Sequence, residues 1–273
     1  MQLMNGKEVS QKLTEILKDE VNKLTKKPSL AIVQVGDNFA SNKYIEYKML
    51  KATELGINKK LFKFSEQISF KELKKEMEFI NENYDGIIIQ LPVPLHLDKN
   101  KVCDLIDIEK DVDGLTSKNL EKLYLNQKAF IPATVKAVLT LLDVYEIEIE
   151  GKTIGVVGQS DLVGKPLSSI LARRGAIVSK YDKESGIEGV ENNDIVIVAT
   201  GVAKLIKKQH LKKGAIVIDV GINQDPQNLS KPIGDVDPEG LEKWVSLISP
   251  VPGGVGPLTV FCLFDNLIET KRK

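Results

Sequence analysis

The sequence is short of cysteine, histidine and tryptophan, the residues that build disulfide scaffolds and many metal sites. Its 273 residues include two cysteines, two histidines and one tryptophan. Cys103 and Cys262 are far apart in the sequence, and no Cys/His cluster accompanies them. This pattern excludes a disulfide scaffold and argues against zinc, so we expect two buried thiols and no metal.

The sequence also lacks an excess of charge and any long apolar run. Lys and Arg total 38, Asp and Glu total 38, and the formal net charge is zero. Such a balance favours neither nucleic acid nor a membrane surface as partner. No apolar run is long enough to span a bilayer, and residues 1–6 lack the apolar core of a secretory signal. We therefore expect a soluble, cytoplasmic protein.

What the chain does contain is an alternation of strand and helix patterns. In the first part, helices are expected at residues 7–24, 38–55, 70–81, 98–106 and 133–145, and strands at 30–35, 60–64 and 86–90. In the second part, strands are expected at 153–157, 177–181, 195–200, 215–220 and 245–248, and helices at 163–174 and 258–270. Continuous apolar strands between helices are typical of parallel sheets covered on both faces.

The pattern predicts an α/β protein with two domains flanking a cleft. The first is an N-terminal α/β domain with a parallel sheet, and the second is a Rossmann-like dinucleotide-binding domain. The acidic alternation at residues 143–151 marks the boundary. We expect the first domain to comprise residues 1–141 with the last helix, 259–273, and the second to comprise 142–258.

Residues 249–259 form a segment rich in proline and glycine. Three prolines and three glycines in eleven residues predict one rigid, shaped loop, with Pro257 suited to the first turn of the following helix. The simpler interpretation is a connection between a strand and the last helix. The functional interpretation is the wall of a ligand site.

A glycine-bearing turn follows the strand expected at 153–157. Gly158, Ser160 and Gly164 lie between that strand and a helix, where a backbone can approach a pyrophosphate. The spacing does not match G-x-G-x-x-G, and Pro166 stands where a P-loop needs Ser or Thr. The turn either binds a dinucleotide or is an ordinary strand-to-helix connection.

Three other short segments carry polar side chains at positions where a ligand could bind. Tyr44 and Lys48 share one helix face at a spacing of four, although a solvated face would look the same. Short-chain dehydrogenases also carry a Tyr-x-x-x-Lys pair, but theirs comes after the glycine-rich turn. Here the pair precedes the turn, so we reject that class of enzyme. Gln90 ends a buried strand just before a proline turn, which is where ligands sit in open α/β sheets. Asp111 and Asp113 precede Gly114 and suggest either a turn or a carboxylate for ligand N–H groups.

Taken in order, these segments resemble the bifunctional methylenetetrahydrofolate dehydrogenase/methenyltetrahydrofolate cyclohydrolase family over essentially the whole chain. Its signatures are matched at residues 36–48, 85–94, 110–114, 219–222, 234–237 and 250–259. The resemblance implies oxidation of 5,10-methylenetetrahydrofolate with NAD(P)⁺, then hydrolysis of the methenyl product to 10-formyltetrahydrofolate. It places the chain in one-carbon metabolism, tetrahydrofolate interconversion and purine biosynthesis, and it implies a homodimer.

The resemblance also assigns roles to residues of the first domain. It implies that Lys48 shuttles protons, that Gln90 orients Lys48, that Tyr44 stacks on the p-aminobenzoyl ring, and that Asp113 pairs with pterin N–H groups. The folate substrate is expected to lie against Gly253, Gly254, Val255, Gly256 and Pro257.

For the nucleotide, the resemblance implies contacts at Gly158, Gln159, Ser160, Val163, Gly164, Asp182, Lys183, Gly201 and Ile222. Gln159 replaces the family's usual Arg, a natural partner for a 2′-phosphate. Asp182 favours NAD through the ribose hydroxyls, whereas Lys183 suits the 2′-phosphate of NADP. We expect NADP, with NAD as the alternative cofactor.

Two other functions compete with the bifunctional enzyme. One is a monofunctional cyclohydrolase whose nucleotide site has decayed, which the departures at Gln159 and 181–185 suggest. The other is a non-enzymatic folate or nucleotide sensor. Retention of both Lys48 and Gln90 argues against a sensor, since binding alone needs no proton shuttle.

Overall fold

The chain folds into two compact units, described here from a computed structural model that covers residues 1–225 and 228–272. Unit 1 comprises Met1–Gln11 and Thr134–Thr259, and unit 2 comprises Lys12–Ala133 and Val260–Lys273. Three helices cross from one unit to the other along the chain: α1 (Gly6–Lys23), α6 (Ala133–Val144) and α8 (Val255–Glu269). These units place residues 1–11, 134–141 and 259 differently from the domains expected from the sequence, and the functional domain boundaries stay a prediction.

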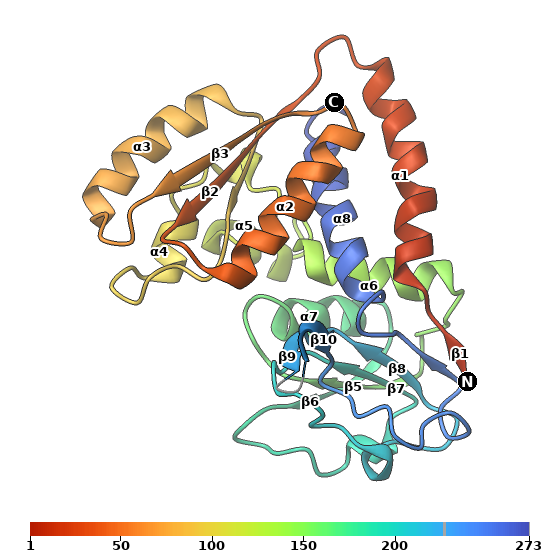
Figure 1. The fold of residues 1–273 in the computed structure, drawn as a ribbon. Coiled ribbons are helices and arrows are strands. Elements are labelled where there is room, and N and C mark those ends of the chain that lie inside the picture. Colours follow the sequence, from red (N-terminus) through yellow and green to blue (C-terminus); the bar gives the residue numbers. More distant parts are fainter. Residues whose placement is uncertain (226–227, 273) are drawn as a thin grey trace. The chain divides into compact units, whose positions relative to one another are not determined.

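Unit 2 is built on a three-stranded parallel sheet in the order β3-β2-β4. The strands are β2 (Ser29–Val35), β3 (Asn58–Phe64) and β4 (Gly86–Ile89). The helices are α2 (Phe39–Glu54), α3 (Phe70–Asn83), α4 (Lys99–Cys103) and α5 (Ser117–Tyr124) (Figure 1). A 3-10 turn, η1 (Ile108–Lys110), lies between α4 and α5 in the chain. The sequence predicted all of these except α5 and η1, and it made α4 too long.

Capping and packing explain these elements. The Asn38 side chain accepts from the Ser41 N–H at the start of α2, and Gly56 follows its end at a φ of +66°. Ser69 and Glu72 form a capping box on α3. One sheet face, including Val33, packs against α3 and α4. Helix α8 packs closely against β4 at Gly86, where a Cβ would lie 2.5 Å from the Leu267 side chain.

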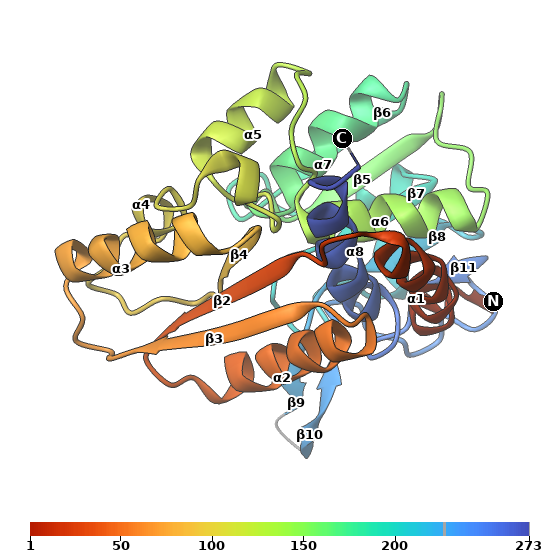
Figure 2. The same ribbon diagram turned by 90° about the horizontal axis from the view of Figure 1, so that it is seen from above.

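Unit 1 is built on a six-stranded, fully parallel sheet in the order β1-β11-β8-β7-β5-β6 (Figure 2). The strands are β1 (Gln2–Leu3), β5 (Thr153–Val157), β6 (Ile177–Tyr181), β7 (Ile195–Val198), β8 (Ile216–Asp219) and β11 (Leu247–Ile248). Helix α7 (Gly164–Arg173) contacts β5 and β6. The strand order reverses at β5, as in a Rossmann-like fold.

The remaining elements of unit 1 were not predicted. β9 (Asn223–Asp225) and β10 (Asn228–Ile233) form an antiparallel pair. Two 3-10 turns, η2 (Val190–Asn192) and η3 (Lys208–His210), join the strands. β1 pairs in parallel with β11, so the first residues of the chain extend the sheet. This strand was not expected, because its two residues, Gln2 and Leu3, form no apolar run.

The proline- and glycine-rich segment is only partly a loop, which corrects the prediction. Helix α8 begins at Val255, so residues 255–259 are helical and the loop ends at Gly254. Proline is tolerated in a first helical turn, and Pro257 lies there as expected. Cys103 and Cys262 are both buried outside any disulfide. Among residues 1–225 and 228–272, no helix combines the length and apolarity that a membrane crossing requires.

Candidate active site

Lys48 is the most unusual residue of unit 2, since its amine is buried. It lies on α2 with 7% of its surface exposed, and its Nζ donates to Gln90 Oε1 at 3.0 Å. Burial lowers the pKa of Lys48, and the nearby Asp113 charge opposes that change. The solvated-face interpretation of Lys48 is therefore excluded, and its amine is closer to the neutral form than an exposed lysine.

Gln90 is held in place from the strand that precedes it. Its N–H continues the ladder of β4 by donating to Val33 O at 2.8 Å. Its Nε2 donates to Leu91 O at 2.9 Å, which leaves Oε1 facing the Lys48 amine. Gln90 is 8% exposed. Because one end of the amide is fixed by the backbone, the other presents a fixed acceptor to Lys48.

The two aspartates of the 110–114 segment have different surroundings. Asp111 is buried, and its carboxylate accepts from the backbone N–H groups of Gly114, Leu115 and Thr116 at 2.7–3.1 Å. Asp113 keeps part of its surface exposed, yet burial of the carboxyl raises its pKa while the Lys48 charge opposes the rise. Asp111 therefore shapes the turn, and Asp113 presents a carboxylate electrostatically coupled to Lys48.

Two asparagines that hold the Asp113 turn were missed from the sequence. Asn266, buried on α8, donates to Val112 O at 2.9 Å and to Ile131 O at 3.0 Å. Asn119, also buried, donates to Gly114 O and exchanges hydrogen bonds with the Phe130 backbone. A polar residue within the apolar pattern of the last helix was the available signal for Asn266.

Tyr44 lies one helical turn before Lys48 on α2 and is half-buried. Burial raises the pKa of its phenol, with Tyr47 adding to the rise. Unit 2 thus brings Lys48 into contact with Gln90, couples it to Asp113, and places Tyr44 on the same helix. These side chains can bind a polar, partly aromatic ligand and can hold or move a proton at Lys48 Nζ.

The glycine turn of unit 1 requires glycine at two positions. Gly158 has a φ of +99°, and a Cβ there would lie 2.2 Å from Ala199 O. A Cβ at Gly164, the first residue of α7, would lie 1.8 Å from Gly158 O. Ser160 Oγ accepts from the Val163 N–H at 3.3 Å. This tight turn, at the carboxyl end of β5 and the start of a helix, fits a dinucleotide pyrophosphate.

Of the side chains expected near the ribose of the cofactor, Gln159 is hydrogen-bonded within unit 1, whereas Asp182 and Lys183 are exposed. Gln159 folds back onto its own unit, donating to Val156 O at 3.0 Å and accepting from Ser168 at 3.5 Å. Asp182 is exposed and uses Oδ1 to accept from Glu184 N and from Ser185 N and Oγ. These local hydrogen bonds lower the pKa of Asp182. Lys183, beside it, is exposed.

Other predicted ligand residues of unit 1 lie on the segments that follow β7, β8 and β11. Gly201 has a φ of +68° and open space around it. A Cβ on Gly256 would lie 3.6 Å from Ile222 Cδ1, so these two predicted contacts are neighbours. Gly253, with a φ of +109°, accepts from the Lys7 N–H at 2.9 Å, and Gly254 N donates to Pro250 O at 2.7 Å.

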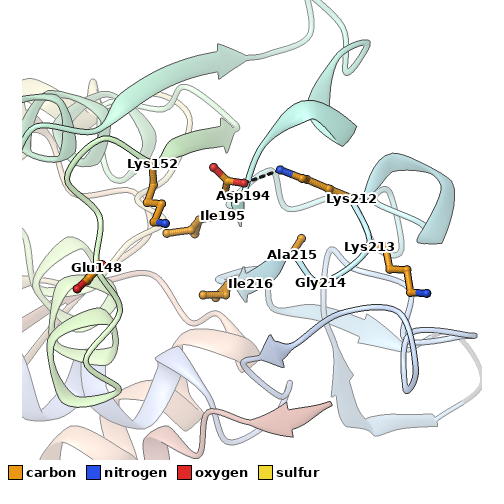
Figure 3. Close-up of a pocket in the computed structure, with 9 residues that line it drawn as sticks. All are labelled: Glu148, Lys152, Asp194, Ile195, Lys212, Lys213, Gly214, Ala215 and Ile216. Atoms are coloured by element: carbon orange, nitrogen blue, oxygen red, sulfur yellow. Dashed lines mark hydrogen bonds and ion pairs between the residues drawn. The ribbon is translucent and has the colours of Figure 1, made fainter.

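A hollow of about 210 Å³ lies at the amino ends of strands β7 and β8 of the unit 1 sheet (Figure 3). Its lining includes Ile195 and Ile216, the first residues of β7 and β8, and the Lys212–Asp194 ion pair at 2.6 Å. Ligands of open parallel sheets bind beyond the carboxyl ends of the strands. We therefore place neither the folate substrate nor the nucleotide cofactor in this hollow.

Asp219, at the end of β8, provides a stability test for unit 1. Burial raises the pKa of its carboxyl to about 6; N–H groups of Val236 and Asp235 oppose the rise, and the Asp235 charge adds to it. The folded state then holds more protons than the unfolded state between about pH 4 and 6. The Asp219 contribution to the free energy of unfolding should fall by up to about 3 kcal/mol as pH rises through that window.

Urea unfolding of wild type and Asp219→Asn at several pH values tests this expectation. The difference between their unfolding free energies should change between about pH 4 and 6 and level off above. Asp237→Asn, which changes a carboxylate that accepts from the Glu239 N–H, is the matched control. A difference that is flat with pH would mean that Asp219 does not titrate in this range.

Fold and site together define a two-unit α/β protein with a buried lysine in one unit and a Rossmann-like sheet in the other. Comparison with family models adds the specific class. Residues 4–113 match the tetrahydrofolate dehydrogenase/cyclohydrolase catalytic domain, and residues 132–273 match the NAD(P)-binding domain of the same family. The chain belongs to the tetrahydrofolate dehydrogenase/cyclohydrolase family, which confirms the resemblance and the predicted fold class.

Individual relatives agree with this assignment. Bifunctional protein FolD of Mycoplasmopsis synoviae is 49% identical over 98% of this chain and 99% of its own length. The crystal structure of the bifunctional FolD dehydrogenase/cyclohydrolase from Campylobacter jejuni is 36% identical, with a TM-score of 0.94 over 99% of this chain and 98% of that one. The Trypanosoma brucei FolD structure, complexed with NADP cofactor and inhibitor, is 30% identical, with a TM-score of 0.91 and coverage of 97% and 95%. These relatives favour the bifunctional enzyme over the monofunctional alternative.

Proposed function

We propose that this chain oxidises 5,10-methylenetetrahydrofolate with NADP⁺ and hydrolyses the methenyl product to 10-formyltetrahydrofolate. The observation that carries the proposal is the buried Lys48 amine held by Gln90, in a chain whose family performs both reactions. A nicotinamide dinucleotide held at Gly158, Ser160 and Gly164 would supply the hydride acceptor for the one-carbon bridge of the folate. The methenyl cation formed is delocalised over two nitrogens, so this step needs alignment rather than a strong base.

The hydrolytic step is where we place Lys48. Water adds to the cationic carbon, and the resulting tetrahedral intermediate must lose a proton from oxygen and gain one at the departing nitrogen. Burial lowers the pKa of Lys48, so its amine is closer to the neutral form than that of an exposed lysine. In that form the amine takes the first proton and returns it at the second position. The cationic substrate lowers that pKa further. Gln90 Oε1 fixes the amine during both transfers.

The remaining site residues bind the two ligands. We assign Asp113 to pterin N–H groups, Tyr44 to the p-aminobenzoyl ring, and Gly253 to Pro257 to the folate. The cofactor rests on Gly158, Ser160, Val163 and Gly164, with Asp182, Lys183, Gly201 and Ile222 towards its two ends. Gln159 acts indirectly on cofactor binding: its side chain donates to Val156 O and so stabilises the shape of the glycine turn. We propose a folate-binding domain of residues 1–141 with 259–273 and a nucleotide-binding domain of residues 142–258.

Hydrolysis of 5,10-methenyltetrahydrofolate without any nucleotide tests the catalytic half of the proposal. The methenyl absorbance should disappear faster with the protein than without it, in proportion to protein concentration. Binding without loss of the methenyl compound would support a folate sensor instead and would contradict the proposal.

Gln90→Glu gives a directional test of the Lys48–Gln90 pair. A carboxylate beside the amine favours the ammonium form and raises the pKa of Lys48. We expect hydrolysis at neutral pH to slow by about ten-fold or more, and to recover partly at higher pH. Gln67→Glu, on an exposed turn, is the control. An unchanged rate and pH profile would remove Gln90 from the mechanism.

We also propose a homodimer formed through unit 1. β6 is an edge strand that pairs with β5, and its first residue, Ile177, is 60% exposed. Exposed edge strands are ready templates for pairing with another chain. Light scattering should give twice the 30.2 kDa chain mass; a monomer at micromolar concentration would contradict this. A cytoplasmic location and a supply of formyl groups for purine biosynthesis complete the proposal.

A further inference from the structure

The 219–222 and 234–237 motifs each contain an aspartate with no role in the chemistry above, Asp219 and Asp235, and the structure brings the two together. Asp219 ends β8, and Asp235 follows β10. The two side chains are 4% and 0% exposed. Burying a carboxylate is unfavourable unless hydrogen bonds compensate it. The partners of these two aspartates therefore indicate what they hold in place.

Asp235 joins two segments that follow different strands. Its Oδ2 accepts from the Thr200 N–H at 2.6 Å, the Thr200 hydroxyl at 2.8 Å and the Gly201 N–H at 2.9 Å. Its Oδ1 accepts from Asn223 Nδ2 at 2.8 Å. The carboxylate thus ties the loop after β7 to the first residue of β9, directly after Ile222.

Asp219 fixes the position of Asp235 itself. Its Oδ1 accepts from the N–H groups of Gly221 and Asp235 at 3.0 Å, and its Oδ2 accepts from the Val236 N–H at 2.9 Å. The Asp219 backbone N–H donates to Ser249 Oγ at 2.8 Å. A linked set of buried hydrogen bonds therefore runs from the segment before Gly253 to the loop after β7.

The glycines of the two motifs make room for these carboxylates. A Cβ at Gly221 would lie 2.0 Å from Asp235 Oδ1, and a Cβ at Gly234 would lie 1.8 Å from Asp219 Oδ2. The segments held in this way are open on their outer side: Gly201 has open space around it, and Ile222 is 46% exposed. A buried anchor beneath exposed residues is the arrangement expected of a binding surface.

We propose that Asp235 is a positioning residue for the nucleotide cofactor, because its carboxylate fixes the backbone at Gly201 and next to Ile222. The inference rests on the proposed function, in which these two residues contact the cofactor. It adds a residue that sets cofactor affinity from beneath the surface. A carboxylate suits this position because it only accepts, and the partners of Asp235 are all donors.

Titration of NADP⁺ into Asp235→Asn tests the proposal, with Asp237→Asn as the matched control. The amide weakens the grip on Thr200 and Gly201, so we expect Kd and the KM for NADP⁺ to rise about ten-fold, and those of the control to stay within about two-fold. Hydrolysis of the methenyl substrate without nucleotide should keep its rate. A merely destabilised protein would lose all activities together, whereas Kd and KM do not depend on the folded fraction.

Thr200→Val keeps the test decisive if Asp235→Asn does not fold. It removes one hydroxyl donor to Asp235 at nearly constant volume, and Kd for NADP⁺ should rise about three-fold. Unchanged NADP⁺ affinity in a folded Asp235→Asn protein, or in Thr200→Val where that protein does not fold, overturns the inference. Failure of the wild type to bind NADP⁺ would instead contradict the proposed function, so the two failures are distinguishable.

Discussion

Replacement of Lys48 by methionine is expected to slow hydrolysis of 5,10-methenyltetrahydrofolate by about 1,000-fold, the scale of a lost general acid–base group. Methionine keeps the apolar length of the buried side chain and removes the amine that donates to Gln90. Oxidation of the methylene substrate should fall much less, by about ten-fold or under, because hydride transfer depends on alignment rather than on a base. Stopped-flow or steady-state absorbance measures both rates.

Lys51→Met is the matched control for this variant. Lys51 lies three residues further along α2, where its amine donates to Thr14 at 3.2 Å and pairs with Glu54 at 2.7 Å. Its replacement removes an amine from the same helix that contacts none of the proposed site residues in these two interactions, and it should leave hydrolysis within about two-fold. If Lys48→Met hydrolysed the methenyl substrate at the wild-type rate, Lys48 would not be the proton shuttle.

Asp113→Asn is expected to lower kcat/KM for both reactions by about 100-fold. Both steps use the same folate site in our proposal, and hydrogen bonds to a charged carboxylate are worth roughly 1.5–3 kcal/mol each. The variant has a second signature, because the Asp113 charge raises the pKa of Lys48. Its loss should lower that pKa, and the pH profile of hydrolysis should move to lower pH, opposite to Gln90→Glu.

Asp107→Asn, an exposed aspartate shortly before the same turn, controls for the change of charge. It should leave both activities and the pH profile unaltered. The assignment of Asp113 would be contradicted if its asparagine variant bound and processed folate as the wild type does, or if only one of the two reactions declined.

Most of the fold could be predicted because its signals are local. The central strands β4 and β7 are continuous apolar runs, and helices such as α2 and α3 carry caps that do not depend on distant contacts. Strand β11 lies within the strand expected at residues 245–248, whereas the two-residue strand β1 depends on pairing with β11, which a local pattern does not contain. The same holds for the β9–β10 pair, whose polar sequence has no apolar alternation.

The identity of the main site residues could be predicted from the sequence, but their contacts could not. Lys48, Gln90 and Asp113 came from motif resemblance, and the structure supplies the burial and hydrogen bonds that the spacing alone left open. Asn266 and Asp235 act through contacts between segments distant in sequence, so no local pattern singles out what they hold. The extent of the 249–259 loop was wrong because proline at a third helical position permits a helix that its composition argued against.

The measurement that tests the central claim most directly is the initial rate of the wild-type protein on 5,10-methylenetetrahydrofolate with NADP⁺ and NAD⁺ side by side. The products are to be quantified as methenyl- plus 10-formyltetrahydrofolate. Our account predicts turnover with NADP⁺ exceeding that with NAD⁺, and 10-formyltetrahydrofolate as the end product. No oxidation with either nucleotide, while methenyltetrahydrofolate is still hydrolysed, would contradict the account of one chain that performs both reactions.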